Sequence, residues 1–305
     1  MRRLFAFLAV GSLLFAACAE DNPTIGATGA TTTGGTGATA PATAADCAAA
    51  NEGALFAPGT LTVATGNPAF EPWFSGGEIE GSEFEFNDPA TGEGYESAVV
   101  YAVAERLGFS DDDVTWVPVT FNKSIAPGPK DFDFNLQQVS YTPKRDDAVD
   151  FSESYYEVNQ ALLSYQGSAV DGATSIADLE DAVLGAPIGT TSLAIIEDLV
   201  QPNAEPQVYD DLAGAIQDLS NKTIDGVVLD LPSAFIAAAI QVPKGVVVGQ
   251  FPTEGEQEYF GMVFAPGNPF VECVNLALDE LKADGTLAAL VQQWLADKTN
   301  APVLT

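Results

Sequence analysis

From residue 60 onward the chain alternates short β-branched runs with apolar residues at helical spacing, and this alternation constrains the fold most. Strands are expected over residues 60–65, 114–119, 132–138, 184–189, 208–209, 226–229, 246–249 and 261–265. Helices are expected over residues 97–107, 175–182, 192–200, 211–219, 233–240, 269–281 and 287–295. Such alternation predicts an α/β fold with parallel-rich sheets covered by helices. The last segment has strand and helix patterns of the same kind as the first. We therefore expect two lobes, with the chain passing between them twice.

The N-terminus predicts export. Arg2 and Arg3 precede an apolar run that is too short for a transmembrane helix, so residues 1–17 are interpreted as a secretory signal peptide. The following Cys18 ends a Leu-Phe-Ala-Ala-Cys sequence that resembles a bacterial lipobox, in which the cysteine receives a diacylglycerol. Cys18 is therefore expected to be a lipid anchor in the membrane. The alternative is ordinary cleavage that leaves a free thiol.

Residues 19–45 consist largely of Thr, Gly, Ala, Pro and Asn, a composition with too little apolar bulk to fold, and residues 18–54 are assigned to a lipid anchor and flexible tether. Two further cysteines remain, Cys47 and Cys273. Since an exported chain enters an oxidising compartment, we expect them to form a disulfide. Two buried free thiols are the alternative.

Charge and composition exclude several classes of function. The chain has 43 acidic against 11 basic residues, a net charge of −32, so it repels the phosphates of nucleic acids and anionic lipids. It has no histidine, which removes the usual Ser-His-Asp triad, the Cys-His dyad and the HExxH zinc site. We expect no catalytic residue, no cofactor and no metal.

An ordered series of motifs resembles that of the extracellular solute-binding proteins of family 3, the polar amino-acid receptors of ABC importers, over about residues 55–300. The motifs are the opening strand at 59–65 with Pro72-Trp73, then Gly94-Tyr95-Glu96, Ser140-Tyr141-Thr142 with Arg145, Asp150-Phe151-Ser152, Tyr155-Tyr156, Gly189-Thr190-Thr191, and residues 225–230.

The resemblance implies a type II periplasmic-binding fold with the ligand in a cleft between two lobes. Lobe 1 would contain residues 55–164 and 252–305, and lobe 2 residues 165–251. It further implies a monomer that captures a small zwitterion such as an amino acid and delivers it to ABC permease subunits. The lipid anchor would hold it at the outer face of the bacterial cytoplasmic membrane.

Three residues match the groups that a zwitterion requires. Arg145 can clamp a carboxylate through two parallel hydrogen bonds, although ion pairing to Asp146, Asp147 or Asp150 is an alternative. Thr191 lies at a strand-to-helix turn and can add its hydroxyl and N–H, or it can simply cap the helix. Asp230 follows a strand and matches the ammonium ligand, with helix capping as its alternative.

The resemblance extends to five other residues. Gln138 and Ser140 match positions that give backbone and hydroxyl contacts, and Phe70 and Phe121 match aromatic walls, although isolated phenylalanines are usually core residues. Asn67 falls near a position that tunes side-chain selectivity, and its neutrality argues against arginine or lysine as the ligand.

The chain departs from the family pattern at residues 124–129, where two prolines and a glycine predict a loop in place of a helix. This change would alter one wall of the cleft, where Lys123 could meet an acidic ligand. Because a fold does not determine a function, an enzyme on the same fold, such as a dehydratase of cyclohexadienyl acids, is the main alternative. A detached sensory module is a third.

Overall fold

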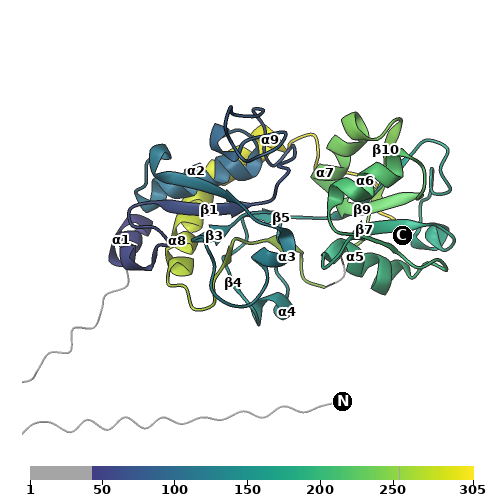
Figure 1. The fold of residues 1–305 in the computed structure, drawn as a ribbon. Helices are drawn as coiled ribbons and strands as arrows, with labels where there is room; N and C mark the ends of the chain where they lie inside the picture. The colour runs from purple at the N-terminus through teal and green to yellow at the C-terminus, as the bar shows by residue number, and fades with distance from the viewer. Residues whose placement is uncertain (1–42, 254) are drawn as a thin grey trace, which may run out of the picture. The chain divides into compact units, whose positions relative to one another are not determined.

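The computed structural model describes residues 43–253 and 255–305. The expected signal peptide (residues 1–17), the lipidation of Cys18 and the tether up to residue 42 lie outside the described residues. The described residues form two lobes, each built on a five-stranded sheet (Figure 1). Within them, no helix is long and apolar enough to cross a membrane.

The first lobe contains a sheet in the order β2-β1-β3-β12-β4. Its strands are β1 (Leu61–Thr65), β2 (Val114–Pro118), β3 (Phe134–Asn135), β4 (Asp150–Phe151) and β12 (Val263–Phe264). Helices α2 (Tyr95–Leu107), α8 (Phe270–Ala283) and α9 (Thr286–Trp294) pack on one another and share a large apolar core with the sheet. All five residues of β1 are buried, which explains its continuous β-branched run.

Gly94 fixes the entry into α2. It adopts φ +93, a conformation that L residues with side chains rarely take. A Cβ atom at this position would lie 2.5 Å from the carbonyl oxygen of Trp73. Only glycine therefore lets this loop approach the start of the helix.

The second lobe contains a sheet in the order β10-β6-β9-β7-β8. Its strands are β6 (Gln160–Tyr165), β7 (Leu184–Pro187), β8 (Gln207–Tyr209), β9 (Gly226–Asp230) and β10 (Gly245–Gln250). The helices are α5 (Thr191–Ala194), α6 (Leu212–Ser220) and α7 (Leu231–Ile236). Helices α5 and α7 each continue into a π-helical turn, at Ile195–Val200 and Ala237–Gln241. Separate apolar clusters cover the two faces of this sheet, as a central α/β sheet requires.

The α/β fold class is confirmed, but both sheets are mixed and not as parallel as the alternation predicts. Strand β1 runs parallel to β2 and β3, and β7 runs parallel to β8 and β9. In contrast, β12 is antiparallel to β3 and β4, and β6 is antiparallel to β9 and β10. The antiparallel strands β6 and β12 are the first strands of each sheet after the chain changes lobes.

The chain crosses between the lobes through a small two-stranded sheet. Strand β5 (Tyr156–Glu157) pairs antiparallel with β11 (Tyr259–Phe260), the outgoing and returning segments respectively. Strand β6 therefore belongs to the second sheet, whereas the expected boundary at residue 164 places it in lobe 1. The apolar pattern of β6 is the same in either lobe, so the sequence does not reveal this boundary.

The last residues of the chain return to the second lobe. Val303 forms a parallel bridge with Gln250, and the N–H of Leu304 donates to the carbonyl oxygen of Gln250 at 2.9 Å. The N–H of Thr305 likewise donates to Thr174. The expected assignment of all residues from 252 to 305 to lobe 1 is therefore wrong for this C-terminal end.

The segment around Cys47 is a helix and not part of a flexible tether. Helix α1 (Ala44–Ala50) begins at Thr43, whose hydroxyl accepts a hydrogen bond from the N–H of Asp46. Cys47 forms the expected disulfide with Cys273 on α8, with their Cα atoms 5.2 Å apart. The expected tether over residues 18–54 is thus wrong from residue 43 onward, because N-capping and the disulfide order a segment whose composition alone favours disorder.

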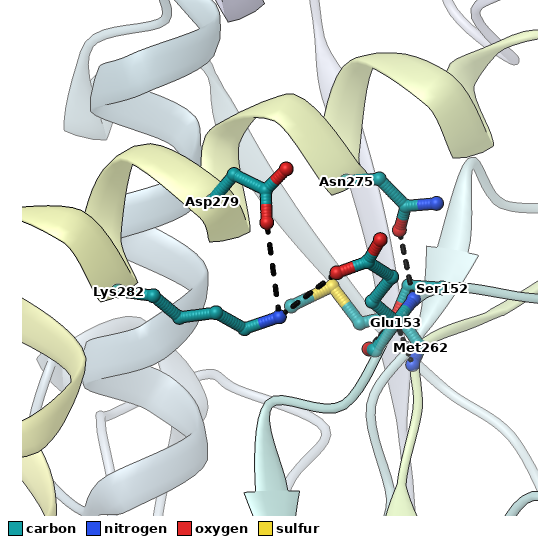
Figure 2. Close-up of polar contacts among 6 residues, drawn as sticks. All are labelled: Ser152, Glu153, Met262, Asn275, Asp279 and Lys282. Atoms are coloured by element: carbon teal, nitrogen blue, oxygen red, sulfur yellow. Dashed lines mark hydrogen bonds and ion pairs between the residues drawn. The ribbon is translucent and has the colours of Figure 1, made fainter. Parts of the chain in front are cut away.

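Helix α8 also holds the segment that leads to the first crossing (Figure 2). The side-chain oxygen of Asn275 accepts from the N–H of Glu153 at 2.8 Å, and Lys282 pairs with the Glu153 carboxylate at 3.0 Å. The hydroxyl of the adjacent Ser152 accepts from the N–H of Met262 at 2.8 Å. These bonds join the outgoing chain, the returning chain and α8.

Several elements are shorter than expected, among them the strand expected at 261–265, which is reduced to β12. The helix expected at 175–182 is a single 3₁₀ turn, Ile176–Leu179, which Ser175 and Asp178 close with a capping box. The strand expected at 132–138 is reduced to β3, since Gln138 adopts φ +49. The remaining short elements are the helices α3 (Phe121–Ser124) and α4 (Pro143–Asp146) and 3₁₀ turns at Glu52–Ala54, Pro89–Thr91 and Asp111–Asp113.

Candidate ligand-binding site

A cavity of about 320 Å³ lies between the lobes, where β1 and β3 of the first sheet and β7 and β9 of the second end. Ligands of open α/β sheets bind at the carboxyl ends of strands because the loops there leave polar groups free. The cavity is lined by all eight residues that the sequence nominates, namely Asn67, Phe70, Phe121, Gln138, Ser140, Arg145, Thr191 and Asp230. The structure thus brings them together, and their roles toward a ligand remain predictions.

Arg145 is the cation of this cavity. It lies on α4, where Thr142 caps the helix by accepting from the Arg145 N–H, and only 9% of the residue is exposed. Its guanidinium donates to the carbonyl oxygens of Ser140 at 2.5 Å and Gly189 at 2.8 Å, and it lies 5.2 Å from the centre of the Phe121 ring. Burial lowers the pKa of Arg145 to about 10, so it remains charged at neutral pH.

The alternative of a structural ion pair for Arg145 does not hold. Among the described residues, no carboxylate lies within ion-pair distance of Arg145, including those of Asp146, Asp147 and Asp150. The other arginine of the described residues, Arg106, pairs with Asp284 at 2.6 Å on the surface of the first lobe, as a solvated helix position predicts. Arg145 is therefore buried beside the cavity without a direct ion pair in the part of the chain that the structure describes, and the nearest compensating charge is the Glu258 carboxylate.

Thr191 lies beside Arg145 at the start of α5. The helix is capped by Thr190, whose hydroxyl accepts from the N–H of Leu193 at 3.1 Å, so Thr191 is not the capping residue. The hydroxyl of Thr191 lies 3.3 Å from that of Ser140, which links the two lobes. The N-terminus of a helix favours an anion, so Arg145, Ser140 and Thr191 form a site for a carboxylate.

Glu258 is a site residue that the sequence analysis missed. One oxygen of its carboxylate accepts from the hydroxyls of Ser140 at 2.5 Å and Thr191 at 2.7 Å, and from the side-chain amide of Gln160 at 3.1 Å. It precedes β11 on the returning crossing, where no periodic pattern marks it. Only the three-dimensional structure reveals that this carboxylate lies between the hydroxyls of Ser140 and Thr191, two residues that the sequence had indicated.

Asp230 lies at the end of β9 and caps α7. Its Oδ1 accepts from the N–H of Ser233 at 2.8 Å, so the capping alternative is observed. Capping through one oxygen is compatible with a ligand contact through the other. Burial raises the pKa of Asp230 to about 6. Because this value is still below 7, the carboxylate is mostly ionised at neutral pH.

Gln138 is held by Glu96, a second residue whose role the sequence did not reveal. The fully buried Glu96 carboxylate accepts from the N–H of Gln138 at 2.8 Å, from its side-chain amide and from the hydroxyl of Tyr155. Burial raises the pKa of Glu96 to about 7. The motif Gly94-Tyr95-Glu96 was visible in the sequence, but the left-handed backbone that Glu96 supports at Gln138 was not.

Both aromatic walls line the cavity, and Phe121 also packs against a small apolar cluster of the first lobe. Phe70 is half-buried and packs on Phe86, with ring centres 5.5 Å apart, and Phe121 lies under Arg145. Asn67 lines the cavity, but its amide donates to the carbonyl oxygen of Glu83 and accepts from the N–H of Glu85. Its side chain therefore orders the neighbouring loop.

Lys123 does not reach the cavity. It lies on the short helix α3, is exposed, and pairs at 3.4 Å with Asp131, which follows that helix in the chain. The residues that follow, from 125 to 130, form a loop of turns as the prolines predict. The expectation that Lys123 could meet an acidic ligand is wrong for this structure, because α3 directs the lysine toward the outside.

The cavity can hold a small zwitterion chemically. Arg145, Ser140 and Thr191 suit a carboxylate, Asp230 suits an ammonium, and Phe70 and Phe121 give apolar walls. Two further carboxylates, Asp210 and Asp211, line the second-lobe side. Within the described ranges, no three acidic or cysteine side chains are grouped to hold a metal ion.

Comparisons with known proteins find relatives that are named for amino-acid binding. The chain is 27% identical to a probable histidine-binding protein of Campylobacter jejuni over 244 residues, covering 77% of this chain and 85% of that protein. A structure of an ancestral arginine-binding protein bound to glutamine has a TM-score of 0.63 and 26% identity, covering 78% of this chain and 98% of that one. An ancestral amino acid-binding protein that is a precursor of cyclohexadienyl dehydratase has a TM-score of 0.63 and 28% identity, covering 77% of this chain and 95% of that one. The family model of the bacterial extracellular solute-binding proteins, family 3, matches residues 76–297, and the chain belongs to this family.

Proposed function

We propose that this protein is an extracytoplasmic receptor that binds one amino acid in the inter-lobe cavity and delivers it to the permease of an ABC importer. The observation that carries the proposal is that one cavity is lined by both Arg145, a buried guanidinium without an ion-pair partner among the described residues, and the carboxylate of Asp230. Within residues 43–253 and 255–305 no carboxylate lies within ion-pair distance of the guanidinium, so the site favours a ligand that brings a carboxylate into direct contact with Arg145.

The geometry supports a distinct role for each polar residue. The ligand carboxylate would accept from Arg145, from the N–H and hydroxyl of Thr191 and from the hydroxyl of Ser140, and the ligand ammonium would donate to Asp230. Phe70 and Phe121 would cover the apolar stem, while Glu96 would hold Gln138 in place. Because Arg145, Ser140 and Thr191 come from both lobes, a bound carboxylate would connect the lobes and stabilise their closed arrangement.

The partners and the location belong to the same proposal. A closed receptor presents both lobes to the permease, and a monomer is sufficient because the cavity is complete within one chain. Acylation of Cys18 would place the receptor at the outer face of the cytoplasmic membrane. The relatives named for histidine and arginine binding support an amino acid as the ligand without identifying it.

Catalysis is not part of the proposal. Asp230 and Glu96 have raised pKa values, which general acids also have, but Asp230 caps a helix and Glu96 is fully buried beneath Gln138. Incubation with a cyclohexadienyl acid, followed by chromatography of the products, tests the enzyme alternative directly. We expect no turnover.

Mass spectrometry of small molecules released from the purified, denatured protein tests the proposal. We expect a co-purified amino acid, and we expect the refolded protein to bind that amino acid in calorimetric titration. Histidine, arginine, glutamine, glutamate and cystine form the titration panel when no ligand is retained. A protein that retains no amino acid and binds none of the panel is not the proposed receptor.

A further inference from the structure

The side chain of Glu258 lies directly behind the carboxylate end of the cavity, bonded to residues that line it. Its Oε1 accepts from three side chains, Ser140 of the first lobe and Gln160 and Thr191 of the second. Two of these donors are the hydroxyls that the proposed function assigns to the ligand carboxylate. The protein therefore bonds one of its own carboxylates to the hydroxyls that the ligand carboxylate is expected to use.

The two carboxylates cannot use these hydroxyls at the same time. A serine or threonine hydroxyl carries a single proton to donate, and both protons, on Ser140 and Thr191, point to Glu258. A second anion placed beside Glu258 would meet like charge in a poorly hydrated space, which is unfavourable. A ligand carboxylate must therefore displace the Glu258 side chain before it gains these donors.

The backbone at this position allows such displacement. The carbonyl oxygen of Glu258 accepts from the N–H of Val158 at 3.0 Å, which fixes the main chain to the outgoing crossing. The side chain is only partly buried, and its neighbours Gly255, Glu256 and Gln257 are exposed. Glu258 can thus leave the hydroxyls by rotating its side chain, without a break in the crossing sheet.

We infer that Glu258 is an internal competitor for the carboxylate site, so that the affinity of the receptor is the net result of exchanging one carboxylate for another. The inference rests on the proposed function for the identity of the ligand, but the competition concerns any small carboxylate. Acetate, which lacks an ammonium group, is therefore a probe of this end of the cavity alone.

The expected effect follows from occupancy. If Glu258 holds the hydroxyls for about nine-tenths of the time, only about one-tenth of the molecules can accept a carboxylate, and removal of the competitor raises the apparent affinity about tenfold. Glu258→Ala removes both the charge and the reach of the side chain. Glu258→Asp keeps the charge but shortens the side chain by one methylene, which separates competition from simple charge repulsion.

The experiment is an acetate titration followed through the amide resonance of Thr191, on the native protein, both Glu258 variants and Glu256→Ala. Glu256 is an exposed carboxylate two residues away and serves as the matched control. We expect Glu258→Ala and Glu258→Asp to bind acetate about tenfold more tightly than the native protein, with Glu256→Ala unchanged.

Three results would overturn the inference: equal or weaker acetate binding in Glu258→Ala, tighter binding in Glu258→Ala but not in Glu258→Asp, or no acetate response at Thr191 in any form. Failure of the proposed function has a different signature. The acetate results would then stand as expected while every amino acid of the panel failed to bind.

Discussion

Replacement of Arg145 tests the proposed carboxylate site most directly. Its guanidinium donates to carbonyl oxygens of both lobes, at Ser140 and Gly189. In the complex it would also face the ligand carboxylate, where a planar guanidinium can give two parallel hydrogen bonds. Arg145→Ala removes all of these interactions, whereas Arg145→Lys keeps one positive charge without the planar fork.

The magnitude follows from burial. Removal of one partner of a buried charge pair costs roughly 3–5 kcal/mol, which corresponds to about 10² to 10⁴ in affinity. Because only 9% of Arg145 is exposed, the upper part of this range applies once the lobes have closed. We expect Arg145→Lys to lose about tenfold, since a single ammonium cannot replace two directed donors. The free energy of unfolding should fall by only about 1–2 kcal/mol, as water can reach the freed carbonyls from the cavity.

Calorimetric titration with the amino acid recovered from the native protein measures the loss, and thermal unfolding of each variant checks the fold. Arg106→Ala is the matched control, because Arg106 pairs with Asp284 on the surface, where an ion pair contributes about 0–1 kcal/mol. If Arg145→Ala binds the amino acid as tightly as Arg106→Ala does, Arg145 is not the carboxylate ligand.

Four further predictions concern other parts of the chain. Serine at both Cys47 and Cys273 should lower the free energy of unfolding by about 2 kcal/mol in guanidinium titrations, the low end of the usual range because the lobe has its own core; an unchanged midpoint would contradict this. Gly94→Ala should destabilise by at least about 2 kcal/mol, since its Cβ would lie 2.5 Å from backbone atoms, and a melting temperature equal to the native value would refute the steric argument. Ligand affinity should fall as the pH decreases through about 6, because Asp230, whose pKa is raised to about 6, must be ionised to bind an ammonium; Asp230→Asn should bind weakly without this pH dependence. Cys18→Ser should release the protein from the membrane fraction with ligand binding intact, and unchanged membrane association would count against acylation.

The same raised pKa values have an opposite consequence for stability. Between about pH 4 and 6 the folded protein retains the proton on Asp230 that the unfolded chain has lost, and Glu96 extends this behaviour to about pH 7. The contribution of these groups to the free energy of unfolding therefore decreases as the pH rises through this range. Maximal ligand affinity and maximal contribution to stability thus fall at different pH values.

The sequence predicts those parts of the molecule that depend on local pattern. Strands β1, β2, β9 and β10 and helices α2, α6 and α8 lie within a residue or two of their expected bounds, because buried strands and amphipathic helices carry periodic apolar residues. Strand ends and motif order were also sufficient to nominate eight residues of one cavity.

Features that depend on contacts distant in sequence could not be predicted. Ser140 and Glu258 are 118 residues apart, and the hydrogen bond between them exists only because the chain crosses twice between the lobes. The return of residues 303–305 to the second sheet and the ordering of α1 by its disulfide have the same origin. In each case the local composition is compatible with several placements, and tertiary contacts select one.

The cavity is bonded across its two walls by the protein's own groups, and this changes how affinity arises. Arg145 donates to Gly189 across the cleft, and Glu258 accepts from Ser140 on one side and Thr191 on the other. A ligand that enters exchanges internal bonds for its own, so only the difference between the two sets contributes to binding. Loss of a donor such as Arg145 should weaken binding, whereas loss of the acceptor Glu258 should strengthen it. Opposite signs from two neighbouring charged residues are the specific consequence of exchange, since a cavity that merely collects favourable contacts would lose affinity in both variants.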